Sequence, residues 1–434
     1  MFGEQENTDG SCRFRHANTR CDTDVCSTSV RSEDSVFVHD VCICDYLHVC
    51  LFVCMTIPVR VLLLKDSVYT ITFKVEDRDS AQKDITVTGK AQNENVVTAL
   101  GVTVADGIYT LSLTIDEDYA KNNDPDTDIT VSAKDGHSQT DHTFSLTFSA
   151  APGQQVYSAV GTHSFTCPGG VHSISVVAVG GGGSGSDSDY YQQGGGGGGL
   201  GYKNNIAVIP GNSYNVQVGI GGGRVGSVSN GGDSFMTNDQ NEVIVAGNGG
   251  KSGNSDRTSA APYGGYTVHP GGTFVGDGGG RGGGGGAYGG PNGYNSGGGA
   301  GGYSGIGGNG GSGTMGTQHT AGSGGGGGGG GLLGGNAYSC GGGGVGLLGE
   351  GNNGAAGVTS GGGQCGGGGG SSGGNGGKGG RSPSKGGTGG QYGGGGTGQY
   401  AGGNTKAWGY GGGGAVRIIW GEGRSFPSTN TQDA

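Results

Sequence analysis

The chain has 434 residues, and 108 of its 114 glycines lie in residues 153–434. Only 31% of the residues are hydrophobic and 13% are charged, which is too little apolar surface for a conventional core along the whole chain. The net charge of −11 divides into −12 for residues 1–152 and +1 for residues 153–434. A nearly neutral glycine-rich region argues against nucleic acid as a partner, because binding by counterion release needs a basic surface.

Residues 1–64 have no clear domain pattern. Seven of the ten cysteines lie in the first 54 residues, without a CxxC pair or the histidine spacing of a zinc site. Pro58 and Arg60 interrupt the apolar stretch that begins near Val49, so it is too short to span a bilayer, and we expect no membrane insertion. Two interpretations stay open: a secreted disulfide module, or an irregular leader that is not native, with Met55 as the true start. We favour the second.

Residues 65–152 alternate apolar and polar side chains, the pattern of half-buried strands. Turn signals such as Asp106-Gly107 and Asp135-Gly136 separate the runs. The apolar residues of the expected strands are Tyr69, Ile71, Phe73 and Val75; Ile85 and Val87; Val102 and Val104; Tyr109, Leu111, Leu113 and Ile115; Ile129, Val131 and Ala133; and Phe144, Leu146 and Phe148. The spacing predicts a β-sandwich.

The end of this segment resembles a known class of module. DITVSAKDG at residues 128–136, followed by FSLTF at 144–148, is similar to the last two strands of immunoglobulin-like or cadherin-like domains. The resemblance implies an Ig-like or cadherin-like sandwich that serves as a spacer.

Acidic residues gather at the predicted loops and strand ends of this sandwich. Carboxylate oxygens are ligands that calcium prefers, so calcium is the one candidate cofactor. The alternative, a solvated acidic surface, is the interpretation we favour. The candidate ligands are Asp77, Asp79, Asp116, Asp118, Asp124, Asp126, Asp128 and Asp135.

Residues 153–434 begin with strands and continue as glycine tracts. Strands are expected at residues 155–158, 163–166, 173–179, 205–209, 214–218, 234–236 and 242–246. No strand signal occurs from about 247 to 414, and strand character returns at residues 415–420. We predict that this last strand pairs with the early ones and closes a sandwich, from which the glycine tracts extend.

The glycine tracts allow three interpretations. Collagen is excluded, because glycine is not at every third position and only 10 prolines occur. Disorder is the default for such a composition. We favour a packed array of polyproline-II-like glycine strands, in which backbone bonds between neighbours replace apolar burial. Turn-like elements such as Asn292-Gly293, Asn309-Gly310 and residues 352–354 would reverse the short runs.

Both ends of this region resemble one family. GTHSFTCPGGVHSISVVAVGGGG at residues 161–183 looks like the opening of glycine-rich domains in phage tail fibres, and GAVRIIWG at 414–421, with RSFPSTNT at 424–431, resembles the C-termini of such proteins in marine tailed phages. The resemblance implies stacked polyglycine-II strands, a virion or extracellular location, and loops that contact a host cell-surface protein or glycan. Other tail fibre proteins, or a homotrimer of this chain, are the further partners it implies.

Large side chains within the glycine region are the candidate recognition residues, because tyrosine gives a large contact area at little entropy cost. We expect a receptor-binding role for Tyr190, Tyr191, Tyr263, Tyr266, Tyr288, Tyr294 and Tyr303. No acid–base–nucleophile set can be assembled, so we expect no enzyme. Two alternatives remain: a cellular secreted or surface protein resembling the glycine-rich ectodomains of certain receptor tyrosine kinases, and a passive structural protein.

Overall fold

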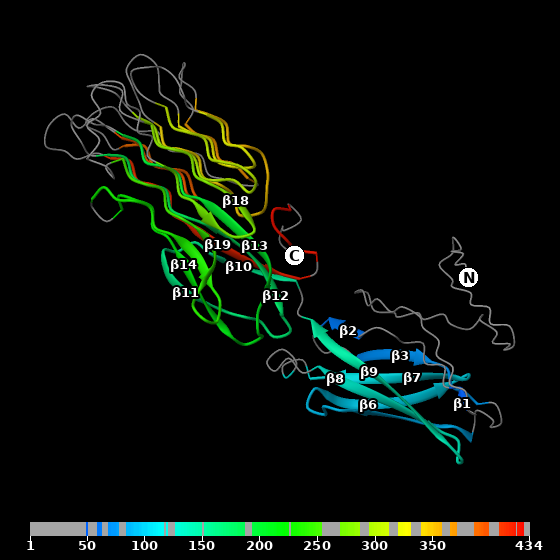
Figure 1. Ribbon diagram of the computed structural model, residues 1–434. Helices are drawn as coiled ribbons and strands as arrows, with labels where there is room; N and C mark the ends of the chain where they lie inside the picture. The colour runs from blue at the N-terminus through cyan, green and yellow to red at the C-terminus, as the bar shows by residue number, and fades with distance from the viewer. Residues whose placement is uncertain are drawn as a thin grey trace, which may run out of the picture. The chain divides into compact units, whose positions relative to one another are not determined.

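The computed structural model describes residues 49–50, 59–62, 68–77, 84–116, 119, 126–149, 152–186, 193–224, 227–253, 270–286, 295–311, 320–330, 340–357, 365–370, 386–398, 408–421 and 423–428. Every element with defined bounds in these residues is a β-strand, which confirms the predicted all-β class (Figure 1). The chain divides into two compact units, Met1–Ala150 and Ala151–Ala434, and each has its own core.

The first unit contains two sheets that share one hydrophobic core. A four-stranded sheet has the order β2-β9-β8-β5, a three-stranded sheet has the order β3-β7-β6, and β1 pairs with β4. The bounds are β1 (Val49–Cys50), β2 (Val59–Leu62), β3 (Val68–Phe73), β4 (Glu76–Asp77), β5 (Thr86–Ala91), β6 (Val97–Ala105), β7 (Ile108–Ile115), β8 (Thr127–Lys134) and β9 (Gln139–Ser149).

The predicted alternation is confirmed most clearly in β7 and β8. In β7 every second residue from Tyr109 to Ile115 is buried, and in β8 Ile129, Val131 and Ala133 are buried in the same core. The turn between β6 and β7 lies at Asp106-Gly107, whose φ angles of 49° and 80° suit a two-residue hairpin turn.

Strand β6 departs from the prediction. Val102 packs on the core, but Val104 is 56% exposed. It lies near the hairpin turn, where the register pairs it with Tyr109 at the end of the sheet. The immunoglobulin-like or cadherin-like nature of the unit stays a prediction.

His142 in β9 is the polar member of the core face. It pairs with Val131 of β8, so its ring lies on the buried side of the sheet. Its Nε2 atom is buried and has no hydrogen-bond partner among the described residues. Burial lowers the pKa of the His142 imidazole below its ordinary value.

The second unit starts as a pair of five-stranded sheets with the orders β10-β19-β12-β13-β18 and β11-β14-β15-β16-β17. The bounds are β10 (Gly153–Tyr157), β11 (Gly161–Thr166), β12 (Ser173–Val179), β13 (Leu200–Ala207), β14 (Ser213–Val218), β15 (Ser234–Thr237), β16 (Val243–Gly247), β17 (Phe274–Val275), β18 (Gly278–Gly280) and β19 (Ala415–Trp420).

The last strand occupies the place that the sequence predicted. β19 lies between β10 and β12 and pairs antiparallel with both. Its Arg417 is fully buried, where Nε donates to Gln154 Oε1 at 2.8 Å and Nη1 donates to the Leu347 carbonyl at 3.0 Å. The strand therefore ties the start of the unit to its glycine-rich part.

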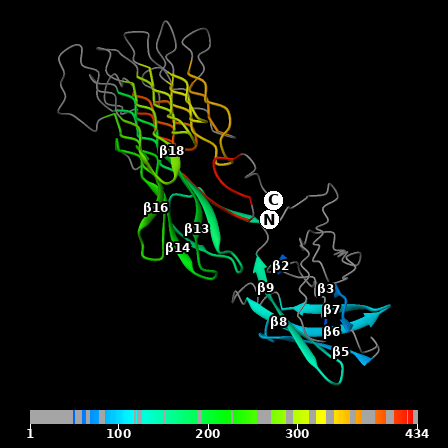
Figure 2. The same ribbon diagram turned by 45° about the vertical axis from the view of Figure 1, so that its right-hand side comes forward.

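Glycine segments continue from the strands and lie side by side in layers (Figures 1 and 2). Residues 193–199 show their arrangement. The amides of residues 194–196 donate to three different segments, and those of residues 197–199 donate to the same three in the same order. The acceptors are the carbonyls of Gly286, Gly396 and Lys251, and then of Gly283, Gly393 and Asn248.

A period of three residues without bonds inside the segment is the geometry of polyproline II. The carbonyls of Gly195, Gly196 and Gly197 accept from residues 298, 183 and 272, which belong to three further segments. Residues 193–199 are thus bonded to six neighbours, and we call the whole array the glycine lattice. The predicted packing of glycine strands is confirmed.

Most glycines of the inner lattice segments have no space for a side chain. A Cβ atom on Gly195 would lie closer than 3.0 Å to the Gly183 carbonyl, and one on Gly297 would be equally close to the Gly395 carbonyl. Gly413 is different, because nothing lies within 4 Å of a Cβ atom built there.

Two other expectations were wrong. Strand β13 begins at Leu200 rather than at residue 205. Strands β17 and β18 lie where no strand was expected. They are strands because they pair with β16 and β13, and not because of their side-chain pattern. Asn309-Gly310 is not a reversal either. It lies inside a lattice segment, whose residues Gly308 and Gly311 donate to Gly327 and Gly330.

Alanine substitution should separate the two kinds of glycine. We expect Gly297→Ala to destabilise the second unit by about 3 kcal/mol or more, because the neighbouring backbone must move. Gly413→Ala should change stability by less than about 1 kcal/mol. Thermal unfolding followed by tryptophan fluorescence measures both. Equal melting temperatures for the two variants would contradict a close-packed lattice.

The first unit should lose stability in mild acid because of His142. Its folded-state pKa is depressed, so the unfolded chain binds the proton more readily, and the free energy of unfolding falls as pH falls through about 6.5. In His142→Gln this part of the pH dependence should disappear, and in the exposed control His137→Gln it should remain. Denaturant unfolding followed by tyrosine fluorescence across this range tests it, and an unchanged slope in His142→Gln would refute it.

Candidate recognition surface

One end of the glycine lattice is remote from the strands. Residues 180–186 lead away from β12, and Ser186 bonds through its amide to the Gln193 carbonyl of the returning segment. In another part of this end, the Ser296 carbonyl accepts from the Gly286 amide, and the Ser296 amide donates to the Gly311 carbonyl. We call this end of the lattice its far end. Many described segments therefore begin or stop at one surface.

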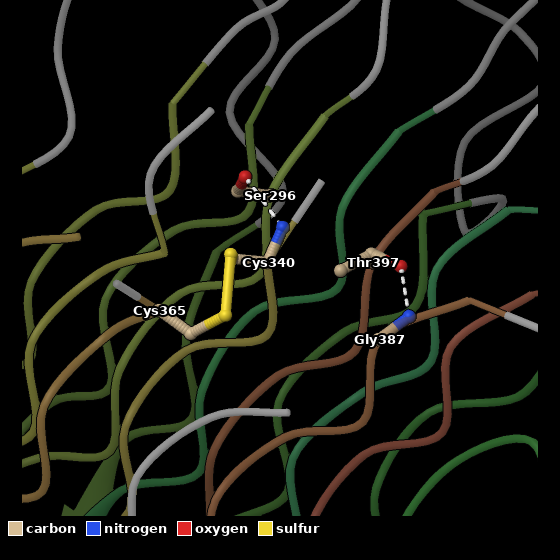
Figure 3. The surroundings of a disulfide bond; sticks show 5 residues. All are labelled: Ser296, Cys340, Cys365, Gly387 and Thr397. Carbon is tan, nitrogen blue, oxygen red and sulfur yellow. Dashed lines mark hydrogen bonds between the residues drawn. A yellow bond between two sulfur atoms is a disulfide. The ribbon is translucent and has the colours of Figure 1, made fainter. Parts of the chain in front are cut away.

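Hydroxyl side chains complete the hydrogen bonds at the far end. Ser186 Oγ accepts from the Gln193 amide at 2.7 Å. Ser296 Oγ accepts from the Cys340 amide at 3.2 Å, and Thr397 Oγ1 accepts from the Gly387 amide at 2.8 Å (Figure 3). These buried hydroxyl oxygens thus satisfy backbone amides in the interior of the lattice.

A disulfide joins two segments close to the far end. Cys340 and Cys365 are bonded, with 5.0 Å between their Cα atoms and 25 residues between them in sequence (Figure 3). The two segments also bond directly, since the Gly366 amide donates to Gly341 and the Gly369 amide donates to Gly344. This pair was not predicted from the sequence, although two cysteines within the glycine tracts are a usable signal.

The sides of the lattice follow a second rule. Where a segment lies at the surface, exposed side chains recur at every third residue, because a three-residue period brings the same direction back to solvent. Such pairs are Asn230 and Asp233, Pro270 and Thr273, Ile306 and Asn309, Thr320 and Ser323, Asn352 and Ala355, and Thr388 and Gln391. The sequence could have shown this X-G-G-X spacing, for example at residues 306–309.

Several of these side chains close the lattice edge. Asn309 Oδ1 accepts from the Gly284 amide at 2.8 Å, and Asn230 Oδ1 accepts from the Ser252 amide at 2.8 Å. Thr320 Oγ1 accepts from the Asn309 amide at 2.8 Å. These three outer amides thus find side-chain acceptors and are not free to pair with another chain.

Tyr303 corrects one predicted role. It is 1% exposed and packs between Tyr202 and Phe426, with ring centroids 6.1 and 6.0 Å away. Its hydroxyl donates to the Gly346 carbonyl at 3.0 Å and accepts from the Gly349 amide at 3.2 Å. Burial raises the pKa of this hydroxyl well above its ordinary value. Tyr303 is therefore a packing residue between the lattice and the sheet, not a surface contact.

The other predicted recognition tyrosines lie outside the described residues. These are Tyr190, Tyr191, Tyr263, Tyr266, Tyr288 and Tyr294. Described residues flank each group in sequence: Ser186 and Gln193, Gly253 and Pro270, and Gly286 and Asn295. All of these flanking residues belong to lattice segments at the far end, as their bonds to Ser184, Lys251 and Ser296 show.

Some predicted calcium ligands can be placed. Asp116 Oδ1 accepts from the Tyr119 amide, Asp128 Oδ1 accepts from Ser145 Oγ, and Asp135 Oδ1 accepts from the amides of residues 137 and 138. Asp126 is exposed, and Asp77 lies in β4. Asp79, Asp118 and Asp124 lie outside the described residues. In the described part, no three acidic, cysteine or histidine side chains come together as a metal site.

A small hollow of about 240 Å³ lies at the other end of the second unit. Its lining is mostly apolar, from the end of β13 and the start of β14, and includes Ile206, Val208 and Tyr214. The Tyr214 hydroxyl is used to accept from the Ile209 amide at 2.8 Å. Asn238, Asp239 and Ile244 complete the lining.

Comparison with known proteins identifies one part of the chain. Residues 158–360 match the family model of a glycine-rich domain. The second unit contains a glycine-rich domain. A search of curated proteins gave no match. No helix within the described ranges is long and apolar enough to cross a membrane.

Removing the disulfide should weaken the glycine-rich domain. We expect Cys340→Ser with Cys365→Ser to lower the free energy of unfolding by about 3 kcal/mol, the usual effect of opening a loop of this length. Denaturant unfolding of the second unit measures it, and Cys167→Ser is the matched control at a buried cysteine outside the disulfide. A midpoint that did not respond to dithiothreitol in the native protein would count against the bond.

Proposed function

We propose that the chain is a non-enzymatic adhesin, with the glycine-rich domain as the receptor-binding part of a phage tail fibre or a similar virion surface protein. One observation carries the proposal. β10 and β19, the first and last strands of the second unit, are neighbours in one sheet, while the lattice segments extend to the opposite end. The sheets would connect the domain to the rest of the chain, and the lattice would hold a binding surface rigidly at the opposite end.

The lattice also explains how such a surface would be held. Each segment end is fixed by backbone bonds to its neighbours, as at Ser186 and Gln193. Connections between fixed ends lose less freedom on binding than connections between mobile ones, which favours affinity. We therefore propose that Tyr190, Tyr191, Tyr263, Tyr266, Tyr288 and Tyr294, which follow such ends in sequence, contact the receptor.

The partner and location follow from the same proposal. The receptor is a host cell-surface protein or glycan, the location is the virion or another extracellular surface, and other fibre proteins or two further copies of the chain complete the assembly. The Cys340–Cys365 disulfide supports an oxidising location, because such bonds persist outside the reducing cytosol. Calcium at the aspartates of the first unit remains a separate proposal.

A passive structural protein is the second candidate function. The lattice is held by backbone bonds between its own segments and by edge-closing side chains such as Asn309. A stiff body of this kind is what a structural protein of a virion or cell surface needs. Binding to cells separates the two functions.

Tyrosine replacement tests the adhesin. We expect Tyr263→Ser with Tyr266→Ser to weaken binding of the purified chain to host cells by about tenfold or more, the effect of losing aromatic anchors. The melting temperature should not change. Ile306→Ser, at an exposed side position of the lattice, is the control and should bind normally. If no cell type bound the native chain above background, the structural function would be preferred.

A further inference from the structure

Asparagine followed by glycine is a reactive pair in proteins. The glycine nitrogen can attack the asparagine side-chain carbon, because glycine has no Cβ to hinder the approach. A bond forms between this nitrogen and Cγ, the bond from Cγ to Nδ2 breaks, and the side-chain nitrogen leaves as ammonia with the amide proton. Water then opens the cyclic imide to aspartate or isoaspartate. The described residues contain this pair at Asn230, Asn248, Asn309 and Asn353.

Backbone carbonyls of the lattice hold the attacking nitrogen at three of these pairs. Gly231 donates to the Gly250 carbonyl at 2.9 Å, Gly310 donates to Gly284 at 2.9 Å, and Gly354 donates to Gly326 at 2.8 Å. The asparagine Oδ1 atoms are held as well, each by a lattice amide at 2.8 Å. Attack would require both bonds to break.

Asn248-Gly249 is held differently. The Gly249 amide donates to Asp233 Oδ1 at 2.7 Å, and Asn248 Oδ1 accepts from Thr273 Oγ1 at 3.0 Å. Asp233 and Thr273 are exposed and belong to segments on opposite sides of the pair, so the nitrogen and the side chain are drawn apart. Two surface side chains thus do here what the lattice backbone does at the other pairs.

We propose that Asn248 is a deamidation site gated by Asp233, and that it is modified before Asn230, Asn309 and Asn353 in the folded protein. The backbone at Asn248 is otherwise fixed, because its amide donates to Thr273 and its carbonyl accepts from Gly199. Losing the bond to Asp233 frees the Gly249 nitrogen without dissolving the segment.

Modification at this surface pair reaches the interior of the lattice. Isoaspartate places an additional methylene group in the backbone. The residues that follow, Gly250 and Gly253, donate to the carbonyls of Gly181 and Ser184, which belong to an inner segment. A lengthened backbone cannot keep both this register and the bond from Gly199 to Asn248.

The test is an ageing experiment on the folded full-length chain at neutral pH, followed by peptide mass mapping of each Asn-Gly pair. We expect Asn248 to convert before Asn230, Asn309 and Asn353 in the native protein. Asp233→Ala should accelerate conversion at Asn248 by about tenfold, the factor for one hydrogen bond to a charged group. Asp233→Asn keeps an acceptor oxygen but not the charge, so its rate should lie between those of the native protein and Asp233→Ala.

Conversion at Asn309 in the same molecules is the internal control for opening of the lattice. Its rate should be the same in the native protein and in Asp233→Ala. Three results would overturn the proposal. One is an equal rise at Asn309 and Asn248 in Asp233→Ala. Another is slower conversion at Asn248 in that variant, which would make Asp233 a base for the attack. The third is native conversion at Asn248 no faster than at Asn309.

Discussion

Hydrogen bonds between backbone amides and carbonyls of segments that are mostly glycine hold the lattice of the second unit together. Each such bond contributes only about 1 kcal/mol net, and ordering glycine is entropically the most expensive choice among residues. The array can therefore be stable only when nearly every amide finds a carbonyl. Residues 193–199 meet this demand, because their successive amides donate to three segments and their successive carbonyls accept from three others.

The sheets provide the template that such an array needs. Residues 180–186 continue directly from β12, and residues 193–199 lead directly into β13. The apolar core between sheet and lattice includes Val177, Leu200, Tyr303, Val345 and Phe426. Strands with ordinary side chains thus fix the spacing of the first glycines, and the backbone bonds extend that spacing outward.

Sequence reasoning predicted the strands where side chains determine them. The alternation in β7, the turn at Asp106-Gly107 and the strand at residues 415–420 were readable, because burial and turn geometry depend on local residue type. Strands β17 and β18 were not readable, because glycines such as Gly278 become a strand only through a partner far away in sequence. Local pattern also misplaces Asn309, because a small polar residue between glycines looks the same in sequence at a chain reversal and at a lattice edge.

The candidate site was predictable to a smaller degree. Composition could single out tyrosines as large side chains in the glycine region, but it could not tell a buried one from an exposed one. Tyr303 occupies the boundary between lattice and sheet, where Tyr202 and Phe426 give it a pocket that only the assembled fold creates. The pairing of Cys340 with Cys365 likewise follows from two segments being neighbours, a relation that no local pattern encodes.

The position of β19 has a consequence for biosynthesis. Arg417 meets Gln154 across a separation of 263 residues, and the strand fills a gap in the middle of its sheet rather than adding to an edge. Until the ribosome has released this strand, β10 and β12 have no common neighbour, and the sheet on which the lattice rests is incomplete. A chain that lacked residues 415–420 would lack the strand that joins β10 to β12. Assembly of the sheet therefore waits for the synthesis of β19, and such long-range pairing is intrinsically slow.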